Sequence, residues 1–263
     1  MSIGRRWKDV VYPLITLLVG VVAWSLAIPA FSVPNYILPT PGSVLAAVYS
    51  GYVGGSYWPH VLFTVQNTLV GYALGCSLAV VFGALLAESR TFERFVYPYI
   101  IALQSMPKVA LAPLIIVWFG FGNLSKVIMV ALICFFPLFV NTSIGIRQTP
   151  PALVNMMRVF SASRLEIFFR VKLRAAMGHI FAGLQIGIVL GLIGAVVGEF
   201  VASTRGLGYL VATSQANFDV ATMFAALVGL VAIGLIGTQI VRAIHGRIVF
   251  WEARSAGETV SEA

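Results

Sequence analysis

The chain has 263 residues, of which 59% are hydrophobic and only 10% are charged, with a formal net charge of +8 at pH 7. This composition excludes a soluble globular protein and is typical of an integral membrane protein. The length allows several spanning helices of about 20 apolar residues each, but no large additional domain. The Lys and Arg residues lie in the gaps between apolar runs, where they indicate membrane topology rather than binding of nucleic acid.

Six apolar runs predict an all-α protein with about six transmembrane helices. The runs are residues 10–30, 61–87, 97–119, 127–142, 180–199 and 220–240. The first run follows Arg5, Arg6 and Lys8 and lacks the small-residue cleavage site of a signal peptide, so we expect it to be retained as a span. Residues 10–248 then form a single transmembrane domain, with 1–9 before it and a flexible tail, 249–263, after it.

The third and fourth runs are interrupted by proline. Pro107, Lys108 and Pro113 fall within the third run, and Pro137 falls within the fourth, which is also short. Because proline removes a backbone donor and kinks a helix, a bent or re-entrant segment is the alternative to a straight span here.

The positive residues gather in alternate gaps and predict the orientation. They are Arg5, Arg6, Lys8, Arg90, Arg94, Arg147, Arg158, Arg164, Arg170, Lys172, Arg174, Arg242, Arg247 and Arg254, whereas residues 32–60 contain no charged residue and the later outward gaps contain Lys126 and Arg205. The positive-inside rule then places both termini and the segment 149–178 in the cytoplasm. Glu199 falls at the outer end of the fifth run, where it would contact an external partner or gate a pathway, or would simply be solvated, as is commoner for a lone carboxylate.

The cytoplasmic segment 149–178 has the pattern of two short amphipathic helices. Pro150 and Pro151 favour a helix start, and an apolar face follows, formed by Leu153, Met156, Met157 and Phe160. Ser163 and Glu166 have the spacing of a capping box, which predicts a second helix with the apolar residues Leu165, Phe168 and Phe169. Such an element would dock into a groove of another protein or lie on anionic lipid headgroups.

Glycines and polar residues within the runs supply two further hypotheses. A glycine stripe in the fifth run, formed by Gly183, Gly187, Gly191, Gly194 and Gly198, would serve internal helix packing or border a pathway at a dimer seam. The polar residues within runs are Gln66, Asn67, Gln104, Ser105, Lys108 and Gln185, and the last four are our pathway candidates. Lys108 would attract an anionic solute, or would reach an interface or a backbone carbonyl instead.

Cys76, Cys134 and the three histidines have no spacing that predicts a disulfide or a metal site. Cys76 and Cys134 fall within apolar runs, where cysteine commonly serves as a small hydrophobic residue. The phosphate-binding pattern Gly-x-x-x-x-Gly-Lys-Ser/Thr is also absent from the sequence. We therefore expect no cofactor on this chain.

Several stretches resemble the permease subunit of binding-protein-dependent ABC importers, in the nitrate, sulfonate and taurine branch. They are the loop from Ala152 to Ala176, Ile37-Leu-Pro-Thr-Pro41, the run from Leu114 to Lys126, Phe136-Pro137, Gly198-Glu199-Phe200 and Gly206-Leu-Gly208. The loop departs from the family at three places, where Asn155-Met156-Met157 replaces Glu-Ala-Ala, Ser161 replaces Gly and Leu173-Arg174 replaces Leu-Pro. Serine can still form the turn at some conformational cost, so the helix-turn-helix should persist.

The resemblance implies a permease fold in a bacterial inner membrane and a role in ATP-driven import of a small solute, anionic for many importers of that branch. It assigns coupling to the ATPase to Arg158, Ser161, Ser163, Arg164, Leu165, Glu166, Phe168, Phe169 and Arg170. The implied partners are ABC ATPase subunits holding ATP and Mg²⁺, a second permease chain, identical or different, an extracytoplasmic solute-binding protein and membrane lipid. The chain itself would not be an enzyme.

Two other classes of membrane protein share this hydropathy. A secondary transporter or channel would work without an ATPase, but the sequence shows no clear internal repeat and no carboxylate deep within a run. A membrane enzyme ranks last because the sequence shows no constellation of nucleophile and base.

Overall fold

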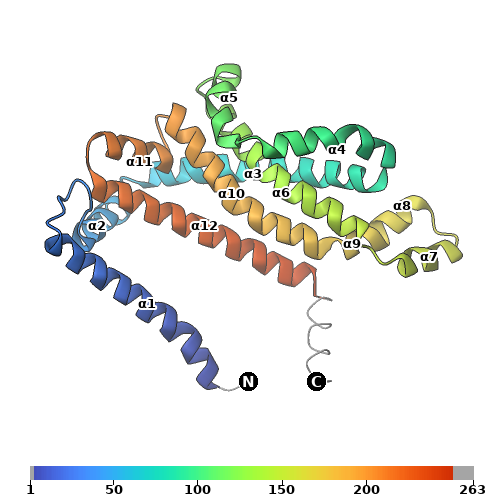
Figure 1. The fold of residues 1–263 in the computed structure, drawn as a ribbon, viewed down its shortest axis with the longest axis horizontal. Helices are drawn as coiled ribbons and strands as arrows, with labels where there is room; N and C mark the ends of the chain where they lie inside the picture. Colours follow the sequence, from blue (N-terminus) through green and yellow to red (C-terminus); the bar gives the residue numbers. More distant parts are fainter. Residues whose placement is uncertain (1–2, 251–263) are drawn as a thin grey trace.

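The computed structural model describes residues 3–250, and this part of the chain is helical and contains no β-strand. Five of its helices are long and apolar enough to cross a membrane: α1 (Ile3–Ala30), α3 (Trp58–Glu88), α6 (Asn123–Arg147), α10 (Met177–Ala202) and α12 (Val220–Ile248). Figure 1 shows α3, α6, α10 and α12 as one bundle, from which α1 diverges. The predicted N-terminal segment 1–9 is helical from Ile3 onward.

The predicted third span is sharply bent. Helix α4 (Arg90–Ser105) and the segment Lys108–Phe119 meet at 90°, and this second segment consists of the 3-10 turn η2 (Lys108–Leu111) and helix α5 (Ala112–Phe119). The bend falls at Met106 and Pro107, whose backbones are extended. The proline thus ends the helix, and the bent alternative to a straight span is the one observed.

The predicted fourth span was too short. Helix α6 has 25 residues and continues through Pro137. The side-chain amide of Asn141 donates to the carbonyl of Pro137 at 2.8 Å, one turn further along. Proline thus interrupts one backbone bond here without ending the helix, because the neighbouring helices support both sides of it.

Helix α6 forms the centre of the bundle, between α3 and α10. On α3, Gly71 and Gly75 lie directly against α6, and a methyl group at Gly75 would lie 2.5 Å from the carbonyl oxygen of Ala131. Small residues at such positions allow close approach of two helix backbones. These two glycines thus allow α3 to pack closely against α6.

The remaining helices are short. They are α2 (Pro41–Val48), the π-turn η1 (Tyr49–Val53), α7 (Pro151–Val159), α8 (Arg164–Ile167), the π-turn η3 (Phe168–Lys172), α9 (Leu173–Ala175) and α11 (Leu207–Ala216). Helix α2 starts where Thr40 accepts a hydrogen bond from the Ser43 N–H, with Pro41 at its first position. Neither α2 nor α11 was predicted from the sequence.

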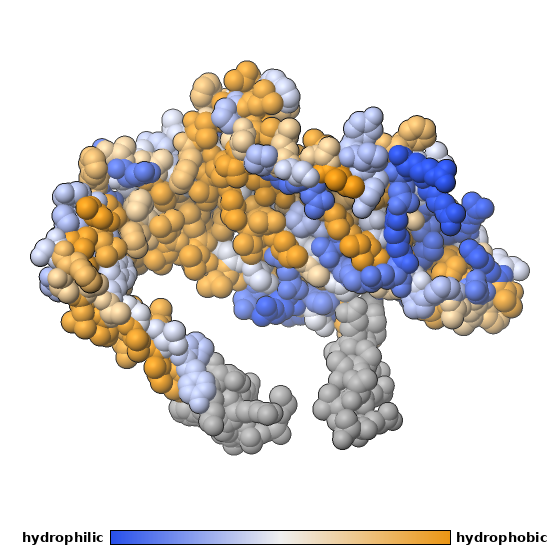
Figure 2. Space-filling model, in the orientation of Figure 1, coloured by the Kyte–Doolittle hydropathy of each residue, from blue (hydrophilic) through white to orange (hydrophobic). Residues whose placement is uncertain are grey.

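Hydrophobic side chains cover the middle of the bundle, while hydrophilic ones gather at the end that carries α7 and α8 (Figure 2). At this end Val249 is buried beside Phe181 of α10, so the predicted tail does not begin as a free segment at 249. Residues 251–263 of that tail lie outside the described residues.

Candidate functional site

The loop between α6 and α10 has the predicted helix-turn-helix structure. Helix α7 and the helical segment formed by α8, η3 and α9 are joined by a turn in which Ser161 has φ +57°. This left-handed conformation costs a non-glycine residue roughly 1–2 kcal/mol. Ser161 therefore makes the turn that glycine would make without that cost.

The predicted capping box is present at the start of α8. The Ser163 hydroxyl accepts from the Glu166 N–H at 3.2 Å, and the Glu166 carboxylate accepts from the Ser163 N–H at 2.9 Å. The hydrogen bonds from Ser163, assisted by Arg170, hold the pKa of Glu166 below its ordinary value. The box thus fixes where α8 begins.

The apolar residues of the second helix do not share one direction. Leu165 and Phe169 are 70% and 59% exposed, whereas Phe168 is half-buried against the hydrophobic core of the bundle. The π-turn η3 contains both phenylalanines, whose rings meet edge to face at 5.0 Å. Val159 and Phe160, in the turn region, are also exposed. The exposed apolar tip of the loop therefore comprises Val159, Phe160, Leu165 and Phe169.

Ion pairs join the hydrophilic end of the bundle. Lys172 of η3 contacts Glu88 at the end of α3 at 2.6 Å, and Arg147 at the end of α6 contacts Glu93 of α4 at 2.7 Å. The guanidinium of Arg147 also donates to the Leu86 carbonyl of α3 at 3.1 Å. The Lys172–Glu88 pair, with the packing of Phe168, attaches the loop to the spans, while Arg147 joins the ends of α6, α3 and α4.

The pathway candidates lie in two places. Gln104 and Ser105 are exposed at the end of α4, while Gln185 is half-buried on α10. The Lys108 ammonium donates to the Gln104 carbonyl at 3.2 Å and lies 4.7 Å from the centre of the Phe136 ring. Lys108 thus bonds a backbone carbonyl, which was one of the alternatives to a role in attracting an anionic solute.

The glycine stripe of α10 faces α6 along most of its length. Gly183 lies against Leu138, Gly194 against the backbone of Val130, and Gly198 against Lys126. A methyl group at Gly187 or Gly191 would have Tyr72, Val130 and Cys134 as its nearest neighbours, at 3.3 Å or more. The closest approaches of the stripe therefore occur at Gly183 and Gly194.

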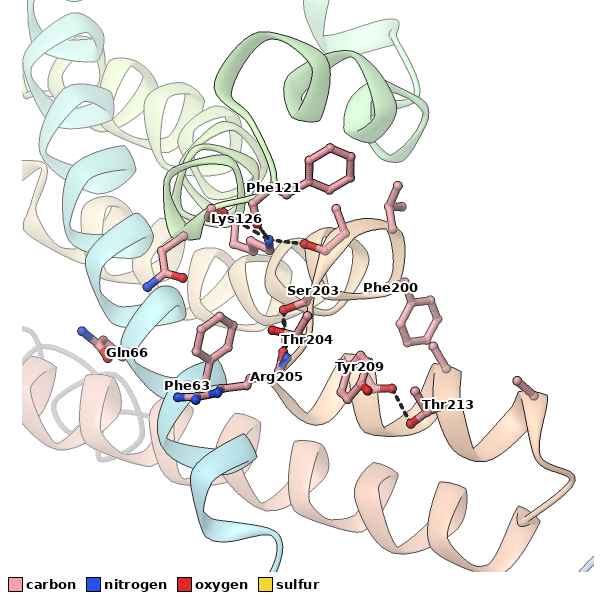
Figure 3. Close-up of a pocket in the computed structure, with 16 residues that line it drawn as sticks. Phe63, Gln66, Phe121, Lys126, Phe200, Ser203, Thr204, Arg205, Tyr209 and Thr213 are labelled. Atoms are coloured by element: carbon pink, nitrogen blue, oxygen red, sulfur yellow. Dashed lines mark hydrogen bonds between the residues drawn. The ribbon is translucent and has the colours of Figure 1, made fainter.

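A cavity of about 860 Å³ lies at the opposite end of the bundle from the loop, and Figure 3 shows its lining. Its walls come from α3, the start of α6, the end of α10 and α11, and include the aromatic residues Phe63, Phe121, Phe200 and Tyr209. Gln66, one of the polar residues noted in the second run, is exposed at this cavity. Sequence reasoning missed the cavity because α11 was not predicted.

The two cations of this cavity have different environments. Lys126, predicted to lie in an outward gap between spans, is only 1% exposed. Its ammonium donates to the carbonyls of Phe121 at 2.6 Å, of Gly122 at 3.1 Å and of Ala202. Arg205 is exposed, and no carboxylate of the described residues lies within ion-pair distance of it. Arg205 is thus the accessible cation and Lys126 a structural one.

The expectation that Glu199 is simply solvated was wrong. Glu199 is 1% exposed, and its carboxyl group accepts hydrogen bonds from the Thr64 hydroxyl of α3 and the Gly208 N–H of α11. The described residues also contain no cluster of His, Cys, Asp and Glu that could hold a metal ion. Glu199 is thus unavailable to an external partner.

Comparisons with known proteins agree with this architecture. The family model described as binding-protein-dependent transport system inner membrane component matches residues 79–250. The riboflavin transport system permease protein RibX of Chloroflexus aurantiacus is 36% identical, over 94% of this chain and 92% of that protein. The formylaminopyrimidine transport permease protein ThiX of Halalkalibacterium halodurans is 28% identical, over 95% and 99%.

The solved structures of inward-facing MetNI, a methionine ABC transporter, include a similar chain. It aligns with a TM-score of 0.61 at 19% identity, over 70% of this chain and 94% of that chain. At this identity the likeness concerns the fold alone. The predicted all-α membrane fold, with five or six spans, is confirmed.

Proposed function

Because the chain belongs to the family of binding-protein-dependent transport system inner membrane components, we propose that its loop 149–178 receives the movement of a separate ATPase subunit. The chain is the permease subunit of an ABC importer, in keeping with its family and with relatives that are named as transport permease proteins. ATP and Mg²⁺ belong to the partner, and this chain performs no covalent chemistry and binds no cofactor. Its contribution to transport is a change between two conformations whose populations the partners bias.

The exposed apolar tip of the loop carries this proposal. Val159, Phe160, Leu165 and Phe169 are exposed at an otherwise hydrophilic end of the bundle (Figure 2). Exposed apolar patches mark sites that contact a protein or a membrane, and the attachment of this loop to the spans favours a protein partner. Arg158, Arg164 and Arg170 surround the tip and would fix its orientation in an ATPase groove.

The anchoring of the loop supports a mechanical role. Phe168 packs into the bundle and Lys172 pairs with Glu88 of α3, so a partner that displaces the tip also displaces the spans. A loop that only lay on lipid headgroups would not need these attachments. Ser161 preserves the turn despite the departures from the family sequence. An ATPase groove adapted to this loop, or a second, different permease chain, would accommodate those departures.

The orientation follows from the same assignment. With the loop in the cytoplasm, both termini are cytoplasmic and the cavity lined by α11 opens to the outside, where a solute-binding protein delivers its cargo. Two permease chains, identical or different, would enclose the pathway within the bacterial inner membrane.

The solute is a small molecule. Relatives are named for riboflavin and formylaminopyrimidine transport, so family membership by itself does not assign a cargo. An anionic cargo would meet Arg205, whose guanidinium is exposed at the cavity, before it met Lys108, which is bonded to the Gln104 carbonyl.

The proposal is tested by gentle purification of the tagged chain from its own membranes, followed by native mass spectrometry and an assay of ATP hydrolysis. We expect two ATPase subunits and two permease chains in one complex that hydrolyses ATP. Repeated isolation without an ATPase, in mild detergent and in lipid nanodiscs, would contradict the proposal and favour a secondary transporter or channel.

A further inference from the structure

The Glu199 carboxyl group lies where three helices meet. Its two oxygens accept from the Thr64 hydroxyl of α3 at 2.8 and 3.0 Å, and one also accepts from the Gly208 N–H of α11 at 2.8 Å. The Thr64 oxygen in turn accepts from the Leu207 N–H at 2.8 Å. Two N–H groups of the first turn of α11 are therefore satisfied by side chains of α10 and α3.

The connection between α10 and α11 is shaped around this carboxyl group. Gly206 has φ +111°, and a methyl group there would overlap the Glu199 carboxyl. A methyl group at Gly208 would lie 2.9 Å from the Glu199 Cβ. The imidazole of His60 on α3 also bonds the Gly206 N–H at 3.2 Å. The start of α11 is thus fitted closely to α10 and α3.

Helix α10 connects the loop to this point. It begins at Met177, at the end of the loop, and its 26 residues extend about 39 Å at 1.5 Å per residue. Its glycines pack against α6, and Lys126 of α6 binds the last carbonyl of α10, that of Ala202. A displacement applied at Met177 therefore reaches Glu199 through one continuous, well-supported helix.

We propose that Glu199 and Thr64 form a latch that makes α11 move as one body with α10 and α3. Glu199 is a positioning residue, since it acts through α11, which forms one wall of the cavity with Tyr209, Ala212 and Thr213. Without the latch, α11 would be held to α10 and α3 by its packing, by the His60 contact with Gly206 and by the short connection of residues 203–206, while its packing against α12 would remain. The inference rests on the proposed function, because the latch would transmit the displacement of the loop by the ATPase to the wall of the cavity.

Thr64 offers a matched pair of substitutions. Thr64→Val preserves the side-chain shape and removes the hydroxyl, whereas Thr64→Ser preserves the hydroxyl. Glu199→Gln is a second variant, which keeps one acceptor oxygen and replaces the other with a donor. The complex is purified with its ATPase in nanodiscs, with spin labels on Leu62→Cys of α3 and Gln215→Cys of α11, both exposed positions. Cys76 and Cys134 are buried and should remain unlabelled.

We expect one narrow distance distribution between the labels in the otherwise unaltered chain and in Thr64→Ser. Glu199→Gln should raise the detached fraction of α11 about tenfold, as expected for the weakening of one hydrogen bond to a carboxylate. Thr64→Val should raise it at least as much, because it removes both the donor to Glu199 and the acceptor of the Leu207 N–H. A control pair, Leu124→Cys of α6 and Val201→Cys of α10, should be unaffected. With ATP and vanadate, the α3–α11 distribution should stay narrow in Thr64→Ser and broad in Thr64→Val.

Equal widths in the Ser and Val variants would overturn the latch, as would equal broadening of the control pair. Hydrolysis of ATP by the same preparation tests the proposed function separately. Absence of an ATPase refutes that function, whereas an active ATPase with unaltered widths refutes the latch alone.

Discussion

Replacing Phe168 and Phe169 one at a time should separate folding from docking. Both residues lie in the π-turn η3, but Phe168 packs against the bundle and Phe169 is 59% exposed. Phe168→Ser should therefore destabilise the permease, while Phe169→Ser should chiefly weaken the contact with the ATPase.

The exposures set the magnitudes. Full burial of a phenylalanine side chain contributes about 1.5–3 kcal/mol, so burial of the exposed share of Phe169 in a groove would contribute about 1–2 kcal/mol. Its loss corresponds to roughly five- to thirtyfold weaker binding for each loop. Truncation of a fully buried phenylalanine lowers the free energy of unfolding by about 3–5 kcal/mol, and truncation of the half-buried Phe168 should lower it by roughly half as much. Either change also removes the edge-to-face ring contact, about 0.5–1.5 kcal/mol.

Two measurements on one set of variants check this. The thermal midpoint of the permease in nanodiscs reports folding, and titration with the purified ATPase subunit reports docking. Phe31→Ser is the matched control, because Phe31 is exposed and lies outside the loop. The docking argument fails if Phe169→Ser binds the ATPase as tightly as Phe31→Ser does. The packing argument fails if Phe168→Ser has the same thermal midpoint as the unaltered chain.

Three further changes have outcomes that the structure predicts. Gly75→Ala should destabilise the permease by about 1–3 kcal/mol, because the added methyl group meets the backbone of α6, whereas Gly187→Ala, with its nearest neighbour at 3.4 Å, should leave the thermal midpoint nearly unchanged. Ser161→Gly should stabilise the loop turn by about 1 kcal/mol, seen as slower hydrogen exchange of the loop amides. Folding lowers the pKa of Glu166, so its carboxylate should stabilise the start of α8 fully above the unfolded pKa of about 4.3. This stabilisation should disappear as the pH falls through the folded pKa. In Glu166→Gln, hydrogen exchange of the loop amides should lose this pH dependence.

Features that depend on neighbours in sequence were predictable. The capping box of Ser163 and Glu166 follows from a spacing of three residues, and the bend at Pro107 follows from the missing backbone donor. The apolar runs located the spans because the bilayer sets their length. The length of α6 was misjudged because α3 and α10 support the helix on both sides of Pro137, and the sequence pattern does not express that support.

Features that depend on distant partners were not predictable. Lys126 and Glu199 resembled exposed charges because their partners, Ala202 and Thr64, are far away in the sequence. Phe168 was grouped with Phe169 because an ordinary helical pattern does not include the π-turn that contains both residues. Helix α11 has 10 residues, too few for a recognisable span, and its first turn relies on acceptors from α10 and α3.

The three carbonyl partners of Lys126 limit which residues position 126 can accept. Among the described residues, its ammonium bonds the carbonyls of Phe121 and Gly122, before α6, and of Ala202, at the end of α10. An ammonium presents three protons from one tetrahedral centre, whereas a guanidinium distributes five across a plane. Arginine would retain the charge but would match these converging carbonyls poorly. The position therefore selects for the shape of the cation, and replacement of lysine by arginine, which is conservative on a surface, would be disruptive at residue 126.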